Sequence, residues 1–558
     1  MSHIHNLASH VTSKVTPQSH PIPGREAEMV PNQAGGFVFA VDDWTRLDRF
    51  LMLGTEGNTY YASESKQTKE ACAAVLRCLA ADGPRTVRRI VEVSDAGKAP
   101  KNDPAILALA AAMKKGDDAT RKLAHEAVPK VCRIGTHLFH LAEAVEAFGG
   151  WGRGTRRAFA SWYLDRDAKG LAYQAVKYQQ RDAWSHRDLL RLSKPRPDRG
   201  NDHDRILHWI TKGWPGIGEE APAATDPLQI VWAFERAKRS ESAKETAQLV
   251  RDFDLPRECV KTEHLDSPEV WDALLHAGAH GMPVHALLRN LGKMAAIGYL
   301  SPMSSAVRTV TDRLSDTDAL RHARVHPLAV LVAQRVYTSG RGVKGSNTWI
   351  PVQQVMDALD GAFYKAFDNV ETTGKRFYLG LDVSGSMDSG LIAGLPGITP
   401  RVGAGAMAMV TAAREPNTYA VGFTAPASGG GYGGMHGGGD TTLTPLRISS
   451  RRRLDDVCKD MAALKLGGTD CSLPMRDALA KKIPVDCFVV YTDSETWAGP
   501  MAPVQALQKY RDGMGISAKL VVVAFTSTGF SIADPKDAGM LDVVGFDPGA
   551  PAVMSAFA

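Results

Sequence analysis

The chain has 558 residues, 44% of them hydrophobic, and a formal net charge of +5 at pH 7. This length predicts several domains or one long repeat array. No run of about 18 apolar residues predicts a membrane span, and the start, Met1-Ser-His-Ile-His-Asn, lacks the pattern of a secretory signal. We therefore expect a soluble, cytoplasmic protein.

The first 28 residues are rich in His, Ser and Pro and match no regular element. We expect residues 1–28 to form a flexible leader. The seven cysteines are odd in number, scattered along the chain and without a C-x-x-C pair. They indicate reduced structural thiols, and Cys72 and Cys78 lack the nearby histidine pair of a zinc site.

The next region, residues 29–370, is helical in pattern throughout. Apolar residues recur three and four apart, and Gly, Asp, Asn or Pro separates the segments. The clearest predicted helices are 65–80, 84–93, 104–114, 119–132, 136–148 and 154–163. Short helices with brief turns favour stacked antiparallel pairs, as in HEAT-like helical repeats.

The basic excess also lies in this region, because residues 376–558 carry 16 Lys and Arg against 17 Asp and Glu. The densest basic segment is 177–191, in which cations alternate with Tyr178, Trp184 and His186. Cations neutralise phosphates and aromatic rings stack on unpaired bases, so the segment favours single-stranded RNA. Local structure is the alternative: Trp184 could be core, and Ser185 with Asp188 resembles a capping box.

A glycine-rich tract at residues 429–439 predicts a flexible surface loop. It follows no clean switch from strand to helix. No Walker-type phosphate loop and no G-x-G-x-x-G opens a helix anywhere in the chain, which argues against a nucleotide-binding enzyme.

The last region, residues 371–558, alternates strand and helix. Apolar runs predict parallel strands at 377–382, 418–423, 485–491, 518–525 and 541–546, with helices at about 402–414, 452–464, 472–482 and 503–511. This alternation predicts a doubly wound α/β sheet, whose ligands bind beyond the carboxyl ends of the strands.

Three polar loops follow in this region, two of them directly after predicted strands. The first offers an acid and two hydroxyls at alternate positions, and the others add a threonine and a second acid; the residues are Asp382, Ser384, Ser386, Thr469 and Asp493. Oxygen-only ligands suit Mg²⁺ or another hard divalent cation. The three loops resemble the metal-ion-dependent adhesion site of von Willebrand factor A domains, and the resemblance implies that these residues are direct or water-mediated ligands.

Several further motifs resemble the Ro autoantigen branch of the TROVE proteins, in order along residues 29–550. The segments that carry the resemblance are Pro31–Leu51, Leu53–Tyr61, Gly150–Gly154, Trp184–Leu192, Ala286–Met294 and Tyr337–Gly342. The resemblance implies a ring of helical repeats with a basic central hole, closed by the A-type domain within one chain and hence monomeric.

The same resemblance implies a function. Proteins of this branch bind small noncoding Y RNAs on the outer surface of the ring, and the hole takes single-stranded 3′ ends of misfolded RNA. The implied role is RNA quality control, with a degradative exoribonuclease tethered through a Y RNA. The residues that match and that we expect to contact RNA are Arg133, Thr136, His137, Lys177, Arg181, His186 and Arg187.

Two functions of other classes stay open from the sequence. A scaffold for adhesion or assembly would use Mg²⁺ to accept a carboxylate from a protein partner. A metal-dependent hydrolase would cleave RNA, although one Mg²⁺ held by two serines is poor equipment for two-metal cleavage. We therefore expect a binding protein without catalytic residues. Arg289 and Lys293, four apart on one helix, could serve RNA or structure.

Overall fold

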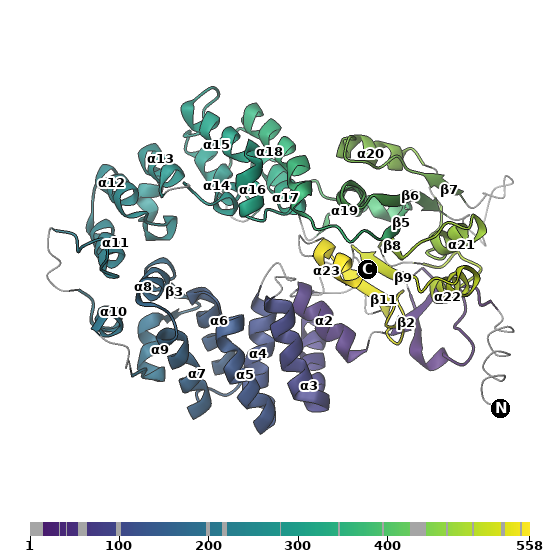
Figure 1. Cartoon of the computed structure of the whole chain (residues 1–558), viewed down its shortest axis with the longest axis horizontal. Coiled ribbons are helices and arrows are strands. Elements are labelled where there is room, and N and C mark those ends of the chain that lie inside the picture. The colour runs from purple at the N-terminus through teal and green to yellow at the C-terminus, as the bar shows by residue number, and fades with distance from the viewer. Residues whose placement is uncertain are drawn as a thin grey trace.

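The computed structural model describes residues 15–32, 34–40, 42–53, 64–95, 102–196, 201–214, 220–278, 281–343, 346–392, 395–424, 442–464, 467–493, 496–525, 530–546 and 550–558. Helices run around an open centre, and an α/β domain closes the circuit (Figure 1). The glycine tract at 429–439 lies outside the described residues. The predicted fold class, a helical-repeat ring with a doubly wound domain, is confirmed.

The helices of the ring pack on their sequence neighbours, as in stacked repeats. They are α2 (Asp43–Leu53), α3 (Glu64–Asp95), α4 (Asp103–Lys115), α5 (Asp118–Val131), α6 (Gly135–Ala147), α7 (Arg153–Leu164), α8 (Ala168–Lys177), α9 (His186–Ser193), α10 (Asn201–Lys212), α11 (Gln229–Arg239), α12 (Ala243–Phe253), η2 (Arg257–Cys259), η3 (Thr262–Asp266), α13 (Pro268–His276), α14 (Val284–Ala296), α15 (Ser305–Ser315), α16 (Thr317–His322), α17 (Pro327–Thr338), α18 (Gln353–Lys365) and η4 (Ala366–Asn369). A two-stranded ribbon, β3 (Gln180–Arg181) and β4 (Trp184–Ser185), interrupts them.

The predicted pair of helices at 65–80 and 84–93 is one element, α3, with non-helical backbone at Asp82 and a proline at position 84. Proline has no N–H to donate and its ring clashes with the preceding turn, so the helix kinks there. The predicted boundary is therefore confirmed as a kink rather than a loop.

The α/β domain contains a six-stranded sheet in the order β11-β9-β8-β5-β6-β7. All five predicted strands are present and parallel, and β7 pairs antiparallel with β6 at the edge. The elements are β5 (Arg376–Asp382), η5 (Gly385–Asp388), α19 (Pro400–Arg414), β6 (Asn417–Thr424), β7 (Thr442–Pro445), α20 (Leu454–Ala462), α21 (Leu473–Ala480), β8 (Cys487–Thr492), α22 (Pro503–Met514), β9 (Lys519–Ala524), β10 (Phe530–Ser531), β11 (Met540–Val544) and α23 (Ala550–Phe557).

Residues 15–40 belong to the α/β domain in space. After η1 (Glu26–Glu28), strands β1 (Met29–Pro31) and β2 (Phe37–Ala40) form a small antiparallel sheet with β10. The prediction of a flexible leader is wrong for residues 15–28, because Gln18 is buried and Ile22 packs in an apolar cluster with Phe39 and Ala502. Residues 1–14 lie outside the described residues. We call residues 15–40 the N-terminal strap.

A buried ion pair joins the ring to the α/β domain beside β10. Arg49 on α2 pairs with Asp542 on β11, and both side chains are less than 5% exposed. Arg49 also donates to the carbonyl of Phe530 on β10 at 3.2 Å. The ring is thus closed by contacts between segments that lie far apart in sequence. Arg49 and Phe530, for example, are separated by 481 residues.

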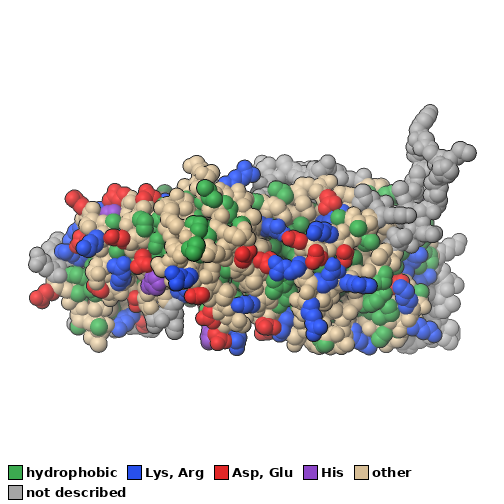
Figure 2. All heavy atoms as spheres, turned by 90° about the horizontal axis from the view of Figure 1, so that it is seen from above, with side chains coloured by type: hydrophobic (Ala, Val, Ile, Leu, Met, Phe, Trp, Pro, Cys, Tyr) green, Lys and Arg blue, Asp and Glu red, His purple; other side chains and the backbone are tan. Residues whose placement is uncertain are grey.

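The outer edge of the molecule carries charges of both signs. Seen from above, Lys and Arg alternate with Asp and Glu over a flat body, without a broad patch of one sign (Figure 2). No helix among the described residues is long and apolar enough to span a membrane. The seven cysteines are free thiols, as expected.

Candidate functional site

Most of the residues expected to contact RNA gather at one end of α6, α8 and α9 and on the β3–β4 ribbon. Arg133 and Thr136 lie at the start of α6, Lys177 ends α8, Arg181 lies in β3 and Arg187 follows the cap of α9. The ribbon packs against α6, and α9 packs against β4. We call Arg133, Thr136, His137, Lys177, Arg181 and Arg187 the α6–α9 surface. Helix α8 and β3 lie on the side toward the open centre of the ring (Figure 1).

The cations of the α6–α9 surface are held mainly by neutral groups. Arg133 donates to the carbonyl and hydroxyl of Ser94, each at 3.0 Å, and Lys177 donates to the Tyr173 hydroxyl at 3.2 Å. Arg181 is exposed and lies 3.6 Å from a carboxylate, that of its neighbour Asp182. Such weakly neutralised cations keep their attraction for phosphate.

Thr136 and His137 are half-buried in the first turn of α6. Asn102 Nδ2 and His137 Nδ1 lie 3.3 Å apart, and burial together with the charge of Arg133 lowers the pKa of His137 to about 4. The imidazole of His137 is therefore neutral at pH 7. It can offer a hydrogen bond or a stacking face but no charge.

His186 does not lie on this surface. Its side chain is buried among Phe139, Trp162 and Tyr163, and its Nδ1 lies 2.8 Å from the Tyr163 hydroxyl. The capping box anticipated at Ser185 and Asp188 is confirmed, and it turns His186 inward as the first residue of α9. An imidazole enclosed in this way has no free face for a base, so His186 lies in the aromatic core beneath the surface and not on it.

Burial also lowers the pKa of His186 to about 4, below the ordinary value of about 6.5. Because the folded state disfavours the proton, His186 contributes stability above about pH 6.5 that is lost as the pH falls toward 4, at about 1.4 kcal/mol per pH unit. Glutamine cannot titrate, so we expect His186→Gln to lower the slope of the unfolding free energy against pH by that amount. The slope is measured by urea unfolding at several pH values across this range. Parallel pH profiles for the two proteins would contradict the assignment.

The second group of expected site residues lies at the carboxyl end of the large sheet. Asp382 ends β5 and is fully buried; its Oδ1 accepts from the backbone N–H of Ser384 at 2.8 Å and its Oδ2 from the Thr492 hydroxyl at 2.9 Å. The hydroxyls of Ser384 and exposed Ser386 lie 3.1 Å apart. The structure thus brings the first acid and both serines together.

Asp493 follows β8, the strand next to β5, and is buried. Burial and then the charge of Asp493 raise the pKa of Asp382 well above the usual range of a carboxyl group. Thr469 is buried in the second of the three loops, and its carbonyl accepts from the N–H of Trp497 at 3.0 Å. Two buried carboxylates that repel each other beside hydroxyl groups fit a hard divalent cation.

The donor set does not fit zinc. No group of three or more His, Cys, Asp and Glu side chains suited to a metal occurs among the residues that the structure describes. The cluster instead offers two acids with Ser and Thr hydroxyls, which are oxygen donors of the kind that Mg²⁺ accepts.

The N-terminal strap supports the loop that carries Thr469, and sequence reasoning missed this contact. The amide of Gln18 donates to Asp470 Oδ1 at 2.6 Å and to the carbonyl of Met501 at 2.9 Å, and its oxygen accepts from the Thr496 hydroxyl. Asp470 is the neighbour of Thr469. No local signal in residues 15–18 reveals this contact, because the partners lie more than 450 residues away.

Arg166 is a second residue that the sequence did not single out. It donates to the carbonyl of Arg133 at 2.9 Å, and its guanidinium lies over the ring of Trp162 at 4.1 Å from the ring centroid. In sequence it stands between Asp165 and Asp167, which is typical of a solvated turn. The structure instead places its charge beside the α6–α9 surface.

Fold and site together define a ring of helical repeats closed by a von Willebrand factor A domain with a polar cluster at its strand ends. Residues 30–336 match the TROVE domain, and residues 376–558 match the Ro60 vWA domain. The chain belongs to the Ro60 family of TROVE-domain proteins.

Two curated relatives are similar over nearly their whole lengths. One is the RNA-binding protein RO60 of Deinococcus radiodurans, 40% identical over 99% of both chains. The other is the RNA-binding protein RO60 of Caenorhabditis elegans, 33% identical over 95% of this chain and 90% of that one. The crystal structure of the Deinococcus radiodurans RO (RSR) protein aligns with a TM-score of 0.75, covering 92% of this chain and 99% of that one.

Proposed function

We propose that this protein is a non-catalytic, cytoplasmic RNA-binding protein. In this proposal it binds Y-type noncoding RNA on the ring and single-stranded 3′ ends of misfolded RNA at the open centre. It acts as a monomer in RNA quality control, and a Y-type RNA links it to an exoribonuclease.

The observation that carries the proposal is the α6–α9 surface, whose cations face mostly neutral partners beside the open centre. The kinship with two RNA-binding proteins over nearly the whole chain supports RNA as the ligand. Acids are present around this surface as well: Asp103 and Asp182 both contact His140. These carboxylates repel phosphates that do not lie against the cations. The expected ligand is therefore an RNA strand whose phosphates lie along the cations of the α6–α9 surface.

The test is a gel-shift titration with one hairpin RNA that carries either a single-stranded 3′ tail or a blunt end, at several salt concentrations. We expect tighter, strongly salt-dependent binding of the tailed RNA, because binding to cations releases counterions. The recovered RNA is expected to keep its length. Shortened RNA would favour a hydrolase, and equal or absent binding of both RNAs would overturn the proposal.

We further propose that Mg²⁺ or another divalent cation binds Asp382, Ser384, Ser386, Thr469 and Asp493. A bound cation would neutralise the repulsion between the two buried acids and leave a coordination position for an external oxygen ligand. The raised pKa of Asp382 means that a proton competes with the metal, so metal affinity rises with pH up to neutrality.

The variant Asp382→Asn is expected to remove the thermal stabilisation that Mg²⁺ gives, while RNA affinity stays unchanged. In the metal-free protein, the stability of the fold changes with pH in the opposite direction. The raised pKa of Asp382 gives stability that is present at low pH and is lost as its carboxyl group ionises toward neutrality. The measurement is thermal unfolding with and without Mg²⁺ at about pH 6 and about pH 8. Asp512→Asn, an exposed acid on α22, is the matched control.

Two results would contradict the metal assignment. One is Mg²⁺ stabilisation that survives in Asp382→Asn. The other is a folded Asp382→Asn protein that no longer binds RNA, which would make the cluster part of the RNA site.

A second candidate function rests on the same cluster. Ser386 is exposed at the strand ends, so a bound cation would be open to a carboxylate from a protein partner. Binding of such a partner should vanish with EDTA and be insensitive to RNase, whereas RNA binding should show the reverse.

A further inference from the structure

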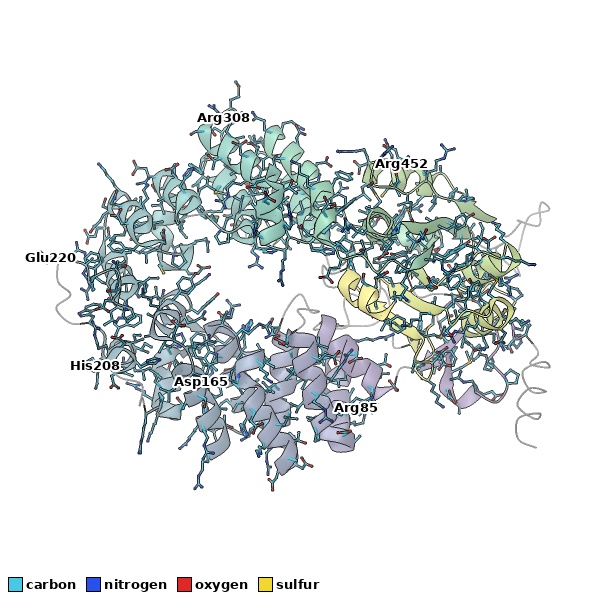
Figure 3. The ribbon with its side chains drawn as sticks, in the orientation of Figure 1. Arg85, Asp165, His208, Glu220, Arg308 and Arg452 are labelled. Atoms are coloured by element: carbon cyan, nitrogen blue, oxygen red, sulfur yellow. The ribbon has the colours of Figure 1, made fainter. Side chains whose placement is uncertain are left out.

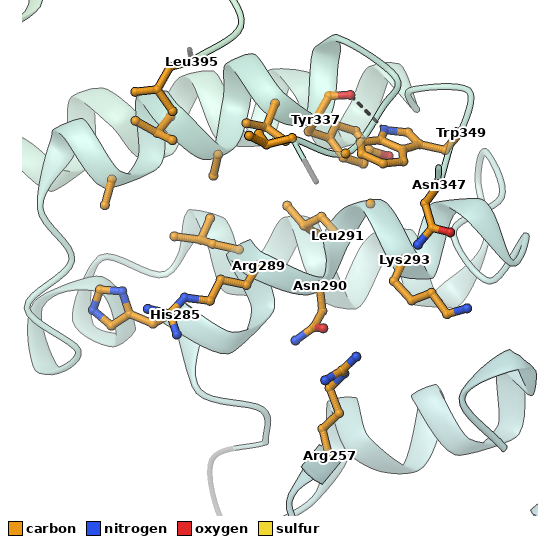
Figure 4. A pocket seen from close by; sticks show the side chains of 18 of the residues that line it. Arg257, His285, Arg289, Asn290, Leu291, Lys293, Tyr337, Asn347, Trp349 and Leu395 are labelled. Atoms are coloured by element: carbon orange, nitrogen blue, oxygen red, sulfur yellow. Dashed lines mark hydrogen bonds between the residues drawn. The ribbon is translucent and has the colours of Figure 1, made fainter. Parts of the chain in front are cut away.

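A large cavity in the described part of the chain lies across the open centre from the α6–α9 surface. It has a volume of about 970 Å³ and lies between α14 and α17, with η2 and η3 on one side. Leu395 and Phe546 of the α/β domain contribute to its wall. Figure 4 shows the two helices running above and below the space. The volume is at the upper end of about 300–1,000 Å³ for small-ligand pockets, enough for more than one nucleotide.

The walls of the cavity are apolar. Leu291 projects from α14 into the space (Figure 4), and the half-buried Val332, Ala333 and Val336 of α17 line it. At one end Trp349 donates from its indole N–H to the carbonyl of Tyr337 at 2.9 Å and lies over Gly292 of α14. A Cβ at Gly292 would lie 2.6 Å from the Trp349 ring, so glycine is what lets the indole settle there.

The rim carries cations. Arg257, Arg289 and Lys293 line the cavity, and Lys293 is paired with Asp266 at 2.6 Å. Within the described part of the chain, neither Arg257 nor Arg289 has a carboxylate partner, and the Nε of Arg257 is buried without a hydrogen bond. A buried guanidinium nitrogen without an acceptor is costly, and an anionic ligand would supply one.

Two amides complete the lining. Asn290 uses its NH₂ group on the carbonyl of Ala286 at 2.8 Å, which leaves its side-chain oxygen for another donor. Asn347 is exposed and lies near Lys293 and Trp349 at one end of the cavity (Figure 4). Amides of this kind pair with the polar edges of bases.

We propose that this cavity is a base-binding pocket for an unpaired stretch of RNA, with one or more bases between α14 and α17 and their phosphates on Arg257 and Arg289. This assignment rests on the proposed binding of single-stranded RNA and names where its bases go. Apolar walls suit the flat faces of bases, the amides suit their edges and the guanidinium groups suit phosphate. An apolar peptide would satisfy the walls and leave the two arginines without acceptors.

The test compares two RNAs by fluorescence anisotropy with the full-length protein. One is a hairpin with a short uridine tail, and the other has the same tail with abasic residues. Because each bound base contributes substantially to affinity, the wild-type protein is expected to prefer the uridine tail by about tenfold or more. Ala333→Trp, which fills the cavity, is expected to bind the two RNAs equally.

The cations have their own expected result. Arg289→Ala should weaken both RNAs and lower the slope of log affinity against log salt by about 0.7. Arg308→Ala is the control, because Arg308 is an exposed arginine at the outer edge of the ring (Figure 3). It should leave the preference for the uridine tail intact.

The outcomes separate the two proposals. If the wild-type protein does not bind the tailed RNA, the proposed function fails and the pocket assignment with it. If the wild-type protein prefers the uridine tail and a folded Ala333→Trp protein keeps that preference, only the pocket assignment fails. Equal affinity of the wild-type protein for both tails also overturns the pocket assignment. An apolar peptide would then be the better candidate for the cavity. Should Ala333→Trp not fold, 4-thiouridine crosslinking of the wild-type protein decides, because crosslinks confined to peptides outside residues 284–296 and 327–349 would overturn the assignment.

Discussion

Replacing Arg133, Lys177, Arg181 and Arg187 together by Ala is expected to weaken binding of tailed RNA by roughly a hundredfold or more near physiological salt. Each phosphate contact that is lost lowers the slope of log affinity against log salt by about 0.7 for a single strand, so four contacts lower it by about 3. Among the residues that the structure describes, the four side chains make no buried ion pair whose loss would destabilise the fold. Anisotropy titrations at several salt concentrations measure both quantities.

The control removes the same net charge elsewhere. Four exposed cations on α15, on or beside α20 and on α22 serve for this purpose: Arg308, Arg451, Lys459 and Lys509. Arg308 points away from the ring in Figure 3. If both quadruple variants lost affinity equally, RNA binding would follow overall charge, and the α6–α9 surface would not be the interface.

Arg49→Ala is expected to lower the free energy of unfolding by roughly 3–5 kcal/mol, because it leaves the carboxylate of Asp542 buried without its cation. The loss falls where α2 meets β11, so the ring should open at this junction first. The measurement is urea unfolding, with protease digestion to locate the opening.

An exposed ion pair between the same helix, α2, and its neighbour α3 provides the comparison. Arg77 donates two hydrogen bonds to Asp43, and both side chains are more than one-third exposed, so Arg77→Ala should cost less than about 1 kcal/mol. Combining Arg49→Met with Asp542→Leu should recover most of the stability, since a buried ion pair can be replaced by apolar contacts. Equal losses from Arg49→Ala and Arg77→Ala would show that the buried pair does not hold the junction.

Regular elements with strong local patterns could be predicted from the sequence. The five parallel strands are continuous apolar runs because both faces of the sheet are covered, and the ring helices show apolar residues three and four apart. Strands β1 and β10 could not be predicted, since they have only three and two residues, and β10 pairs with β2, which lies far away in sequence. Their existence depends on contacts and not on local preference.

For the candidate site, the sequence did not reveal which way each side chain points. His186 stands in a basic segment that reads as one exposed patch, yet the cap at Ser185 turns its ring into the aromatic core. The polar cluster at Asp382 was readable because strand ends fix which residues meet. The cavity between α14 and α17 was not readable, because Arg257, Asn290, Ala333, Leu395 and Phe546 share no local pattern.

The N-terminal strap sets the order in which the molecule can be completed during synthesis. Gln18 leaves the ribosome early, but Asp470, Met501 and Thr496 follow more than 450 residues later. Bringing the ends of such a long segment together costs roughly 5 kcal/mol of chain entropy if the segment is flexible, and less once the intervening helices have stacked into a curve. The stacked helices therefore bring the two ends of the ring close together before they join. The contacts that close the ring form last, and they are hydrogen bonds and a buried ion pair, not a covalent bond.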